Sequence, residues 1–126
     1  MDDHYNIGIL SQKSYAFALR IVNAHKYLVD KNEHVLSKQL LRSGTSIGAN
    51  CRESKNAQSK VDFVHKLNIA LKEADETAYW IELLKDANYI PKDVYESIYS
   101  DCIELVKLLT TIIKTTKENI TVDTEK

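Results

Sequence analysis

Carboxylates and a histidine at helical spacing are the residues of this chain that could bind a metal ion. Asp62 and His65 lie three residues apart, on one face of a predicted helix, and Glu73 and Glu76 follow in the same segment. A carboxylate-bridged di-iron site in a bundle needs a Glu-x-x-His pair on two helices and a carboxylate on each of the other two. The other three histidines belong to no such pair. We therefore expect no metal and no other cofactor.

Clustered hydroxyl groups offer a second kind of chemistry. Ser43, Thr45 and Ser46 lie near Arg42 and Asn50, but no histidine or lysine is placed to activate a hydroxyl group as a nucleophile. Within a helix, such small side chains bond back to the carbonyl one turn earlier. We therefore expect that the protein is not an enzyme.

Two of the three glycines, Gly44 and Gly48, lie one turn apart in a segment that otherwise favours a helix. Glycine inside a helix costs about 1 kcal/mol relative to alanine, so two of them need a compensating reason. A phosphate-binding loop is not the reason, because no Lys-Ser/Thr ending follows and no strand precedes. The spacing predicts that another helix backbone approaches closely here.

Polar residues in the same segment are candidates for fixing helix register. Asn50 follows Ile47 by three and is expected to point inward, where a buried amide must find partners. Arg42 is expected to pair with Glu73, Glu76 or Glu82 across helices or subunits. The alternative is a ligand site, whose residues would be Arg42, Asn50, Arg52 and Glu53.

Charge is unevenly distributed, although the net charge of −1 gives no overall attraction to nucleic acid. Residues 31–60 are rich in Lys and Arg, and residues 61–90 are rich in Asp and Glu. The two segments could simply attract each other, or an oligomer could repeat the basic strip as a phosphate-binding surface. The basic candidates are Lys38, Arg42, Arg52, Lys55 and Lys60. No aromatic residue is interleaved with them on the second predicted helix.

The two cysteines, Cys51 and Cys102, have no local partner. We interpret them as small buried hydrophobic residues in a reducing cytoplasm. A disulfide and a reactive thiol are the alternatives. No apolar run approaches a membrane span and no secretory signal begins the chain, so a cytoplasmic protein without a membrane partner is expected.

Apolar residues recur at helical spacing and predict four helices at about 9–29, 33–55, 60–87 and 92–117, with a frayed polar tail at 118–126. Asn56 or Ser59 could cap the third helix, and Pro91 separates the last two. Short breaks between long helices predict a single all-α domain, residues 1–126, folded as an antiparallel up-down-up-down four-helix bundle.

Several helices carry more apolar surface than one core stripe requires. The surplus either thickens the core or faces a partner subunit, and exposed apolar patches of that extent favour self-association. The predicted packing and oligomer residues are Gly44, Gly48, Asn50, Trp80, Leu83, Tyr95 and Tyr99.

Three runs carry a resemblance to a known family. These are QLLRSGTSIGAN at 39–50 followed by Arg52-Glu53, DFVHKLNIALKEA at 62–74 and ETAYWIELL at 76–84. Together they resemble the four-helix bundle proteins, also called S23-like or ribosomal intervening-sequence proteins because some are encoded inside 23S rRNA genes. The resemblance covers about residues 10–115.

The resemblance implies a small bacterial protein that forms an up-and-down bundle, often a homopentameric ring, with no settled enzymatic activity. Accessory proteins of diversity-generating retroelements are similar and bind nucleic acid and a reverse transcriptase. The expected function is therefore a non-enzymatic homo-oligomer that contacts RNA or DNA. The alternative is a structural scaffold that binds a protein partner without nucleic acid.

Overall fold

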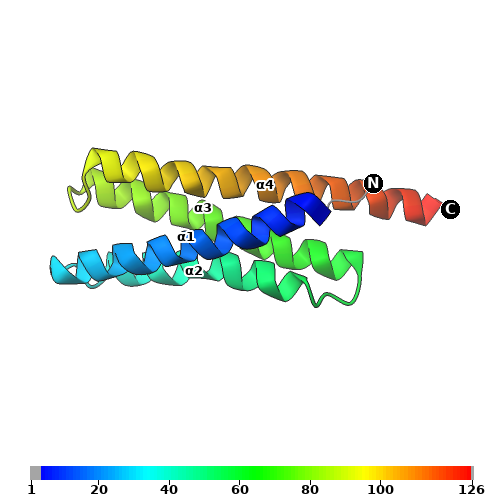
Figure 1. The fold of residues 1–126 in the computed structure, drawn as a ribbon, viewed down its shortest axis with the longest axis horizontal. Coiled ribbons are helices and arrows are strands. Elements are labelled where there is room, and N and C mark those ends of the chain that lie inside the picture. The colour runs from blue at the N-terminus through cyan, green and yellow to red at the C-terminus, as the bar shows by residue number, and fades with distance from the viewer. Residues whose placement is uncertain (1–3, 126) are drawn as a thin grey trace.

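The computed structural model describes residues 4–125, with side chains described up to residue 121. Four helices account for almost all of this range (Figure 1). They are α1 (His4–Asp30), α2 (Leu36–Ser54), α3 (Lys60–Asp86) and α4 (Lys92–Glu125). The all-α prediction is thus confirmed.

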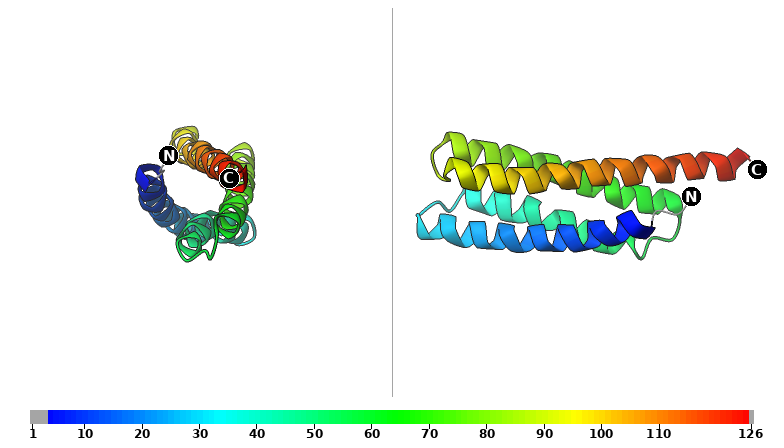
Figure 2. Two further views of the ribbon diagram at one scale, coloured as in Figure 1. Left: turned by 90° about the vertical axis from the view of Figure 1, so that its right-hand side faces the viewer. Right: turned by 45° about the horizontal axis from the view of Figure 1, so that its top comes forward.

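Successive helices run in opposite directions in Figure 1 and surround a common axis in Figure 2. Each helix packs along its neighbour in sequence, whereas α1 and α4 pack against each other less closely. The connections 31–35 and 87–91 lie at one end of the bundle, which we call the loop end. The connection 55–59 lies at the other end, with the start of α1 and the last turns of α4 (Figure 1). We call this the terminal end.

Both connections at the loop end begin with the same helix stop. Asn32 and Asn88 have φ of 66°, the left-handed conformation that asparagine tolerates better than most residues. In each case the next residue returns its N–H to a carbonyl five residues back, Glu33 to Leu28 and Tyr89 to Leu84, both at 2.8 Å. This Schellman arrangement satisfies carbonyl groups that a helix end would otherwise leave unpaired.

Side-chain caps determine where the middle helices begin. The α2 prediction of residue 33 is three residues early, because Glu33 instead caps the helix from outside. Its carboxylate accepts the Ser37 N–H at 2.6 Å, and the Ser37 hydroxyl donates to the Glu33 carbonyl at 2.7 Å. At α3 the Ser59 hydroxyl accepts the Asp62 N–H at 3.1 Å, so Ser59 rather than Asn56 is the cap.

A single core cluster joins all four helices. The side of α3 that faces this core carries apolar and small residues at steps of three and four. Its buried members are Leu67, Ala70, Ala74, Thr77, Ile81 and Leu84. Phe63, one turn before Leu67, is half-buried and packs against the same cluster.

The predicted helix ends at both termini of the chain are wrong. α1 begins at His4 rather than near residue 9, and α4 continues through the expected polar tail to Glu125. Within this stretch Thr116 and Thr121 donate their hydroxyls to carbonyls one turn earlier, at 2.8 and 3.2 Å, so these polar groups are bonded within the helix. Ile120 also packs against the core. Residues 1–3 and 126 lie outside the described range.

Candidate interaction surfaces

The two glycines of α2 lie against α1. A Cβ atom built on Gly44 would come within 2.7 Å of the Ile21 side chain, which is fully buried. A Cβ atom on Gly48 would lie 3.2 Å from the Ser14 carbonyl oxygen. The bare backbone at these positions therefore lets α1 and α2 approach within one molecule.

The opposite side of α2 carries a charged contact with α3. Arg42 pairs with Glu73 at 3.2 Å and with Glu76. The Trp80 indole N–H donates to the same Glu76 carboxylate at 2.9 Å. Arg42 is thus held between two carboxylates of its own chain, which leaves this stretch of the predicted basic strip without surplus positive charge.

Asn50 does not act as the expected inward register residue. Its side chain is half-buried, and its amide donates to the Ser46 carbonyl of its own helix at 2.9 Å. The buried polar contact between α2 and α3 is instead made by Ser43 and Thr77, whose hydroxyls lie 2.9 Å apart and are inaccessible to solvent. The sequence predicted that Ser43 bonds within its own helix, so this contact between helices was missed.

Much of the surplus apolar surface thickens the bundle itself. Trp80, Tyr95 and Tyr99 are half-buried and pack against the core. Tyr95 and Tyr99 form a tilted ring pair with centroids 5.1 Å apart, and Lys85 lies 4.3 Å from the Tyr95 ring centroid. A hydrogen bond to Glu82 raises the pKa of Tyr99 to about 12. Leu83 is half-buried on α3.

The other predicted phosphate contacts are exposed and fall into two groups. Lys38 lies near the start of α2, at the loop end, whereas Arg52, Lys55 and Lys60 lie around the connection at the terminal end. Fourteen residues of helix, about 21 Å, separate Lys38 from Arg52. Among the described residues, no carboxylate lies within ion-pair distance of Lys38, Arg52 or Lys55.

A groove of about 380 Å³ runs between α1 and α2 at the level of Gly48. Its small lining residues include Ala18 and Ala49, and it is bordered by Tyr15 of α1 and by Arg52 of α2. Glu53 also lines it, but pairs with Lys66 of α3 at 3.5 Å. The fold thus places an aromatic ring beside a basic residue of α2, although no aromatic is interleaved among those residues in the sequence.

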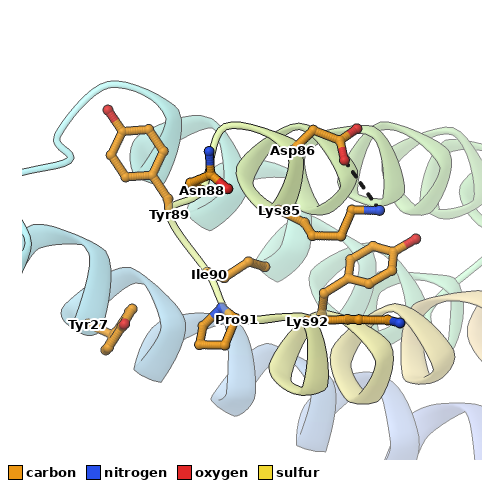
Figure 3. Close-up of a pocket in the computed structure, with 9 residues that line it drawn as sticks. Tyr27, Lys85, Asp86, Asn88, Tyr89, Ile90, Pro91 and Lys92 are labelled. Carbon is orange, nitrogen blue, oxygen red and sulfur yellow. Dashed lines mark ion pairs between the residues drawn. The ribbon is translucent and has the colours of Figure 1, made fainter.

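A second cavity, of about 590 Å³, lies at the loop end (Figure 3). Tyr27 of α1 faces the connection that carries Tyr89 and Pro91. Its two lysines both have acidic neighbours: Lys85 pairs with Asp86 at 3.3 Å, and Lys92 lies 3.8 Å from Glu96. This cavity therefore offers little net attraction for an anion.

Both cysteines are buried and free. Burial raises the pKa of the Cys51 thiol to about 11, against a weaker opposing effect of a hydrogen bond to Ser14. Burial, together with the charges of Asp75 and Asp101, raises the pKa of Cys102 to about 12. Both thiols are protonated near neutral pH, so neither matches a reactive nucleophile.

The carboxylates considered for a metal ion have other partners, and the histidine faces solvent. Glu73 and Glu76 pair with Arg42, Asp62 accepts the Gln58 N–H at 3.3 Å, and His65 is exposed. Within residues 4–121, no three His, Cys, Asp or Glu side chains gather as a metal site. No helix of the described residues is both long enough and apolar enough to cross a membrane.

Residues 9–111 contain α2, α3, most of α1 and the first part of α4, and this range matches the family model described as 23S rRNA-intervening sequence protein. The chain belongs to this family. A crystal structure of a protein of unknown function from the S23 ribosomal protein family of Bacteroides thetaiotaomicron is 57% identical in sequence. It aligns with a TM-score of 0.85 over 86% of this chain and 98% of that chain. No curated protein sequence matches the chain.

Proposed function

We propose that this intervening-sequence protein is a non-enzymatic module that self-associates and contacts RNA or DNA through Arg52, Lys55 and Lys60. The observation that carries the proposal is the exposure of Arg52 and Lys55 at the terminal end without a carboxylate partner among the described residues. Their acidic neighbour Glu53 is engaged by Lys66. Exposed lysine and arginine side chains without a carboxylate partner attract phosphate groups.

Repetition would strengthen a surface of three basic residues. Three phosphate contacts from one copy give weak binding, because nucleic-acid affinity grows with the number of phosphates neutralised. Tethered copies bind one strand with a higher effective concentration. We expect a mass in solution several times the 14.4 kDa of one chain. Light scattering that reports a single chain at tens of micromolar would contradict self-association.

Apolar side chains on α3 are the candidates for the contact between copies. Tyr79 is 56% exposed and packs edge-on against Trp80 with ring centroids 5.0 Å apart. Leu83 lies one turn further along the same helix. Aromatic anchors of this kind carry much of the energy of protein interfaces. A homopentamer, as the family resemblance implies, is the assembly we propose.

The test is binding of a structured RNA and a DNA duplex at about 50 and 200 mM salt. Affinity should fall steeply with salt, and Lys55→Gln should weaken binding and reduce the salt dependence by about one phosphate equivalent. Lys38→Gln is the matched control, since it removes the same charge from the other end of α2. The proposal is contradicted if the two variants change nucleic-acid affinity equally. It is also contradicted if affinity does not depend on salt, or if the protein binds no nucleic acid.

A structural scaffold for a protein partner is the second candidate. The exposed ring of Tyr79 favours it, because the same surface could accept another protein. It predicts a partner that co-purifies with the wild-type protein and is lost with Tyr79→Ala, together with no affinity for nucleic acid.

A further inference from the structure

The groove between α1 and α2 has the components of a nucleotide site. We propose that it holds one unpaired nucleotide of a bound strand, with the base stacked on Tyr15 and the phosphate on Arg52. This inference rests on the proposed nucleic-acid function and names the kind of strand and the contacts that would recognise it.

Groove shape follows from the close helix contact. Gly48 leaves no side chain between the helices, and Ala18 and Ala49 add only methyl groups. The Ser14 carbonyl lies close to the position of a Gly48 Cβ atom, so the helix backbones form the floor. The volume of about 380 Å³ lies within the range of small-ligand sites.

The two bordering side chains are available for a ligand. Tyr15 is 57% exposed, and its hydroxyl has no hydrogen-bond partner among the described residues. Arg52 is exposed and has no carboxylate partner there. An exposed aromatic ring stacks on a base of any sequence, and a guanidinium group can bind two phosphate oxygens.

Hydroxyl groups could orient the base inside the groove. Ser11 and Thr45 line it from opposite helices. The Thr45 hydroxyl donates to the Leu41 carbonyl at 2.7 Å, which leaves its oxygen as an acceptor for a base N–H group. These groups read no particular base, so the expected selectivity is for unpaired over paired strands rather than for sequence.

In a duplex each base is stacked between its neighbours, so its faces are covered, and only an unstacked base of a single strand can stack on Tyr15. The exposed Lys55 lies one helical turn beyond Arg52, toward the terminal end. It is placed for the phosphate of a neighbouring nucleotide. The strand would therefore run from the groove toward the terminal end of the bundle.

The experiment measures binding of a fluorescein-labelled 20-nucleotide oligo-uridine and of a 20-base-pair duplex to the full chain. Tyr15→Ala should weaken oligo-uridine binding about tenfold, the range of one lost stacking contact, with an unchanged salt dependence. Tyr15→Phe keeps the ring and should bind within twofold of wild type. Tyr89→Ala is the control, because Tyr89 is an exposed tyrosine at the loop end, outside the groove and outside the proposed contact between copies. Duplex binding should not respond to Tyr15→Ala.

The outcomes separate this inference from the proposed function. If the wild-type protein binds no nucleic acid at any salt concentration, both fail. If it binds with salt dependence and Tyr15→Ala binds oligo-uridine equally well, the groove assignment fails and the proposed function stands. A smaller oligomer mass for Tyr15→Ala would show that a second copy covers the groove, which also overturns the assignment.

Photochemical cross-linking gives a second, independent readout. Oligo-uridine that contains 5-iodouridine should cross-link to Tyr15, identified by mass spectrometry of the cross-linked peptide. Cross-links confined to other aromatic residues would overturn the proposal even if the variants bind weakly for other reasons.

Discussion

Helix α2 contacts its two neighbours in sequence by different means. Toward α1 it presents bare backbone, with Ile21 seated against Gly44. Toward α3 it presents hydrogen bonds and charge, the buried Ser43–Thr77 pair and Arg42 with its carboxylates. The first contact fixes how close two helices lie, and the second fixes how they are aligned. Added volume should therefore damage the first, whereas a lost partner should damage the second.

The largest effect is expected at Gly44. Gly44→Leu forces a side chain into the space of Ile21, whose atoms would lie 2.7 to 3.0 Å from an added Cβ atom, and should destabilise the fold by about 3 kcal/mol. Urea unfolding followed by circular dichroism measures this. Gly8→Leu is the control, because nothing lies within 4 Å of a Cβ atom there. Gly8→Leu should stabilise α1 slightly. A similar loss of unfolding free energy in both variants would contradict the close-contact explanation.

The next effect is expected at the buried hydroxyl pair. Thr77→Val leaves the Ser43 hydroxyl without its partner on α3 and should cost about 2 kcal/mol. Adding Ser43→Ala removes the stranded hydroxyl as well, so the double variant should be less destabilised than the sum of the two single variants. Strict additivity in the same unfolding assay would show that the two residues act separately.

A smaller effect is expected at Gly48. Alanine favours the helix by about 1 kcal/mol, but its methyl group would press on the Ser14 carbonyl, which belongs to backbone and cannot rotate away. We expect a net loss of up to about 1 kcal/mol for Gly48→Ala, seen as a lower thermal midpoint. A raised thermal midpoint would show that α1 can move away from α2 near Gly48.

The smallest effect is expected at Arg42. Its side chain is 51% exposed, so Arg42→Gln should cost only about 0.5 kcal/mol, and less at high salt. Chemical denaturation by urea at low and high NaCl measures the difference. A loss that is large or independent of salt would mean that Arg42 contributes by packing beside Trp80 rather than by charge.

Local signals in the sequence predicted much of this fold. Apolar spacing located the four helices, and the Ser59 hydroxyl opens α3 as one of the two predicted caps. The glycine spacing pointed to a close helix contact. The end of α4 was missed because its threonines and charges carry no apolar period, whereas the helix there rests on Ile120.

Contacts between helices were harder to predict than the helices themselves. The sequence left three acidic residues as ion-pair partners of Arg42. The structure shows that Arg42 pairs with two of them, Glu73 and Glu76. Tyr15 and Arg52 are 37 positions apart in the chain, and their common groove depends on the alignment of α1 with α2. That alignment follows from packing around the core, which no single segment encodes.

The position of the two chain ends has a practical consequence. His4 and the last turns of α4 both lie at the terminal end, which also holds Lys55 and Lys60. The connections that contain Asn32 and Asn88 lie at the loop end (Figure 1). An affinity tag or fluorescent fusion at either end of the chain would crowd the basic residues. A reporter inserted beside Asn88 would leave them open, so it is the safer design for measuring what the protein binds.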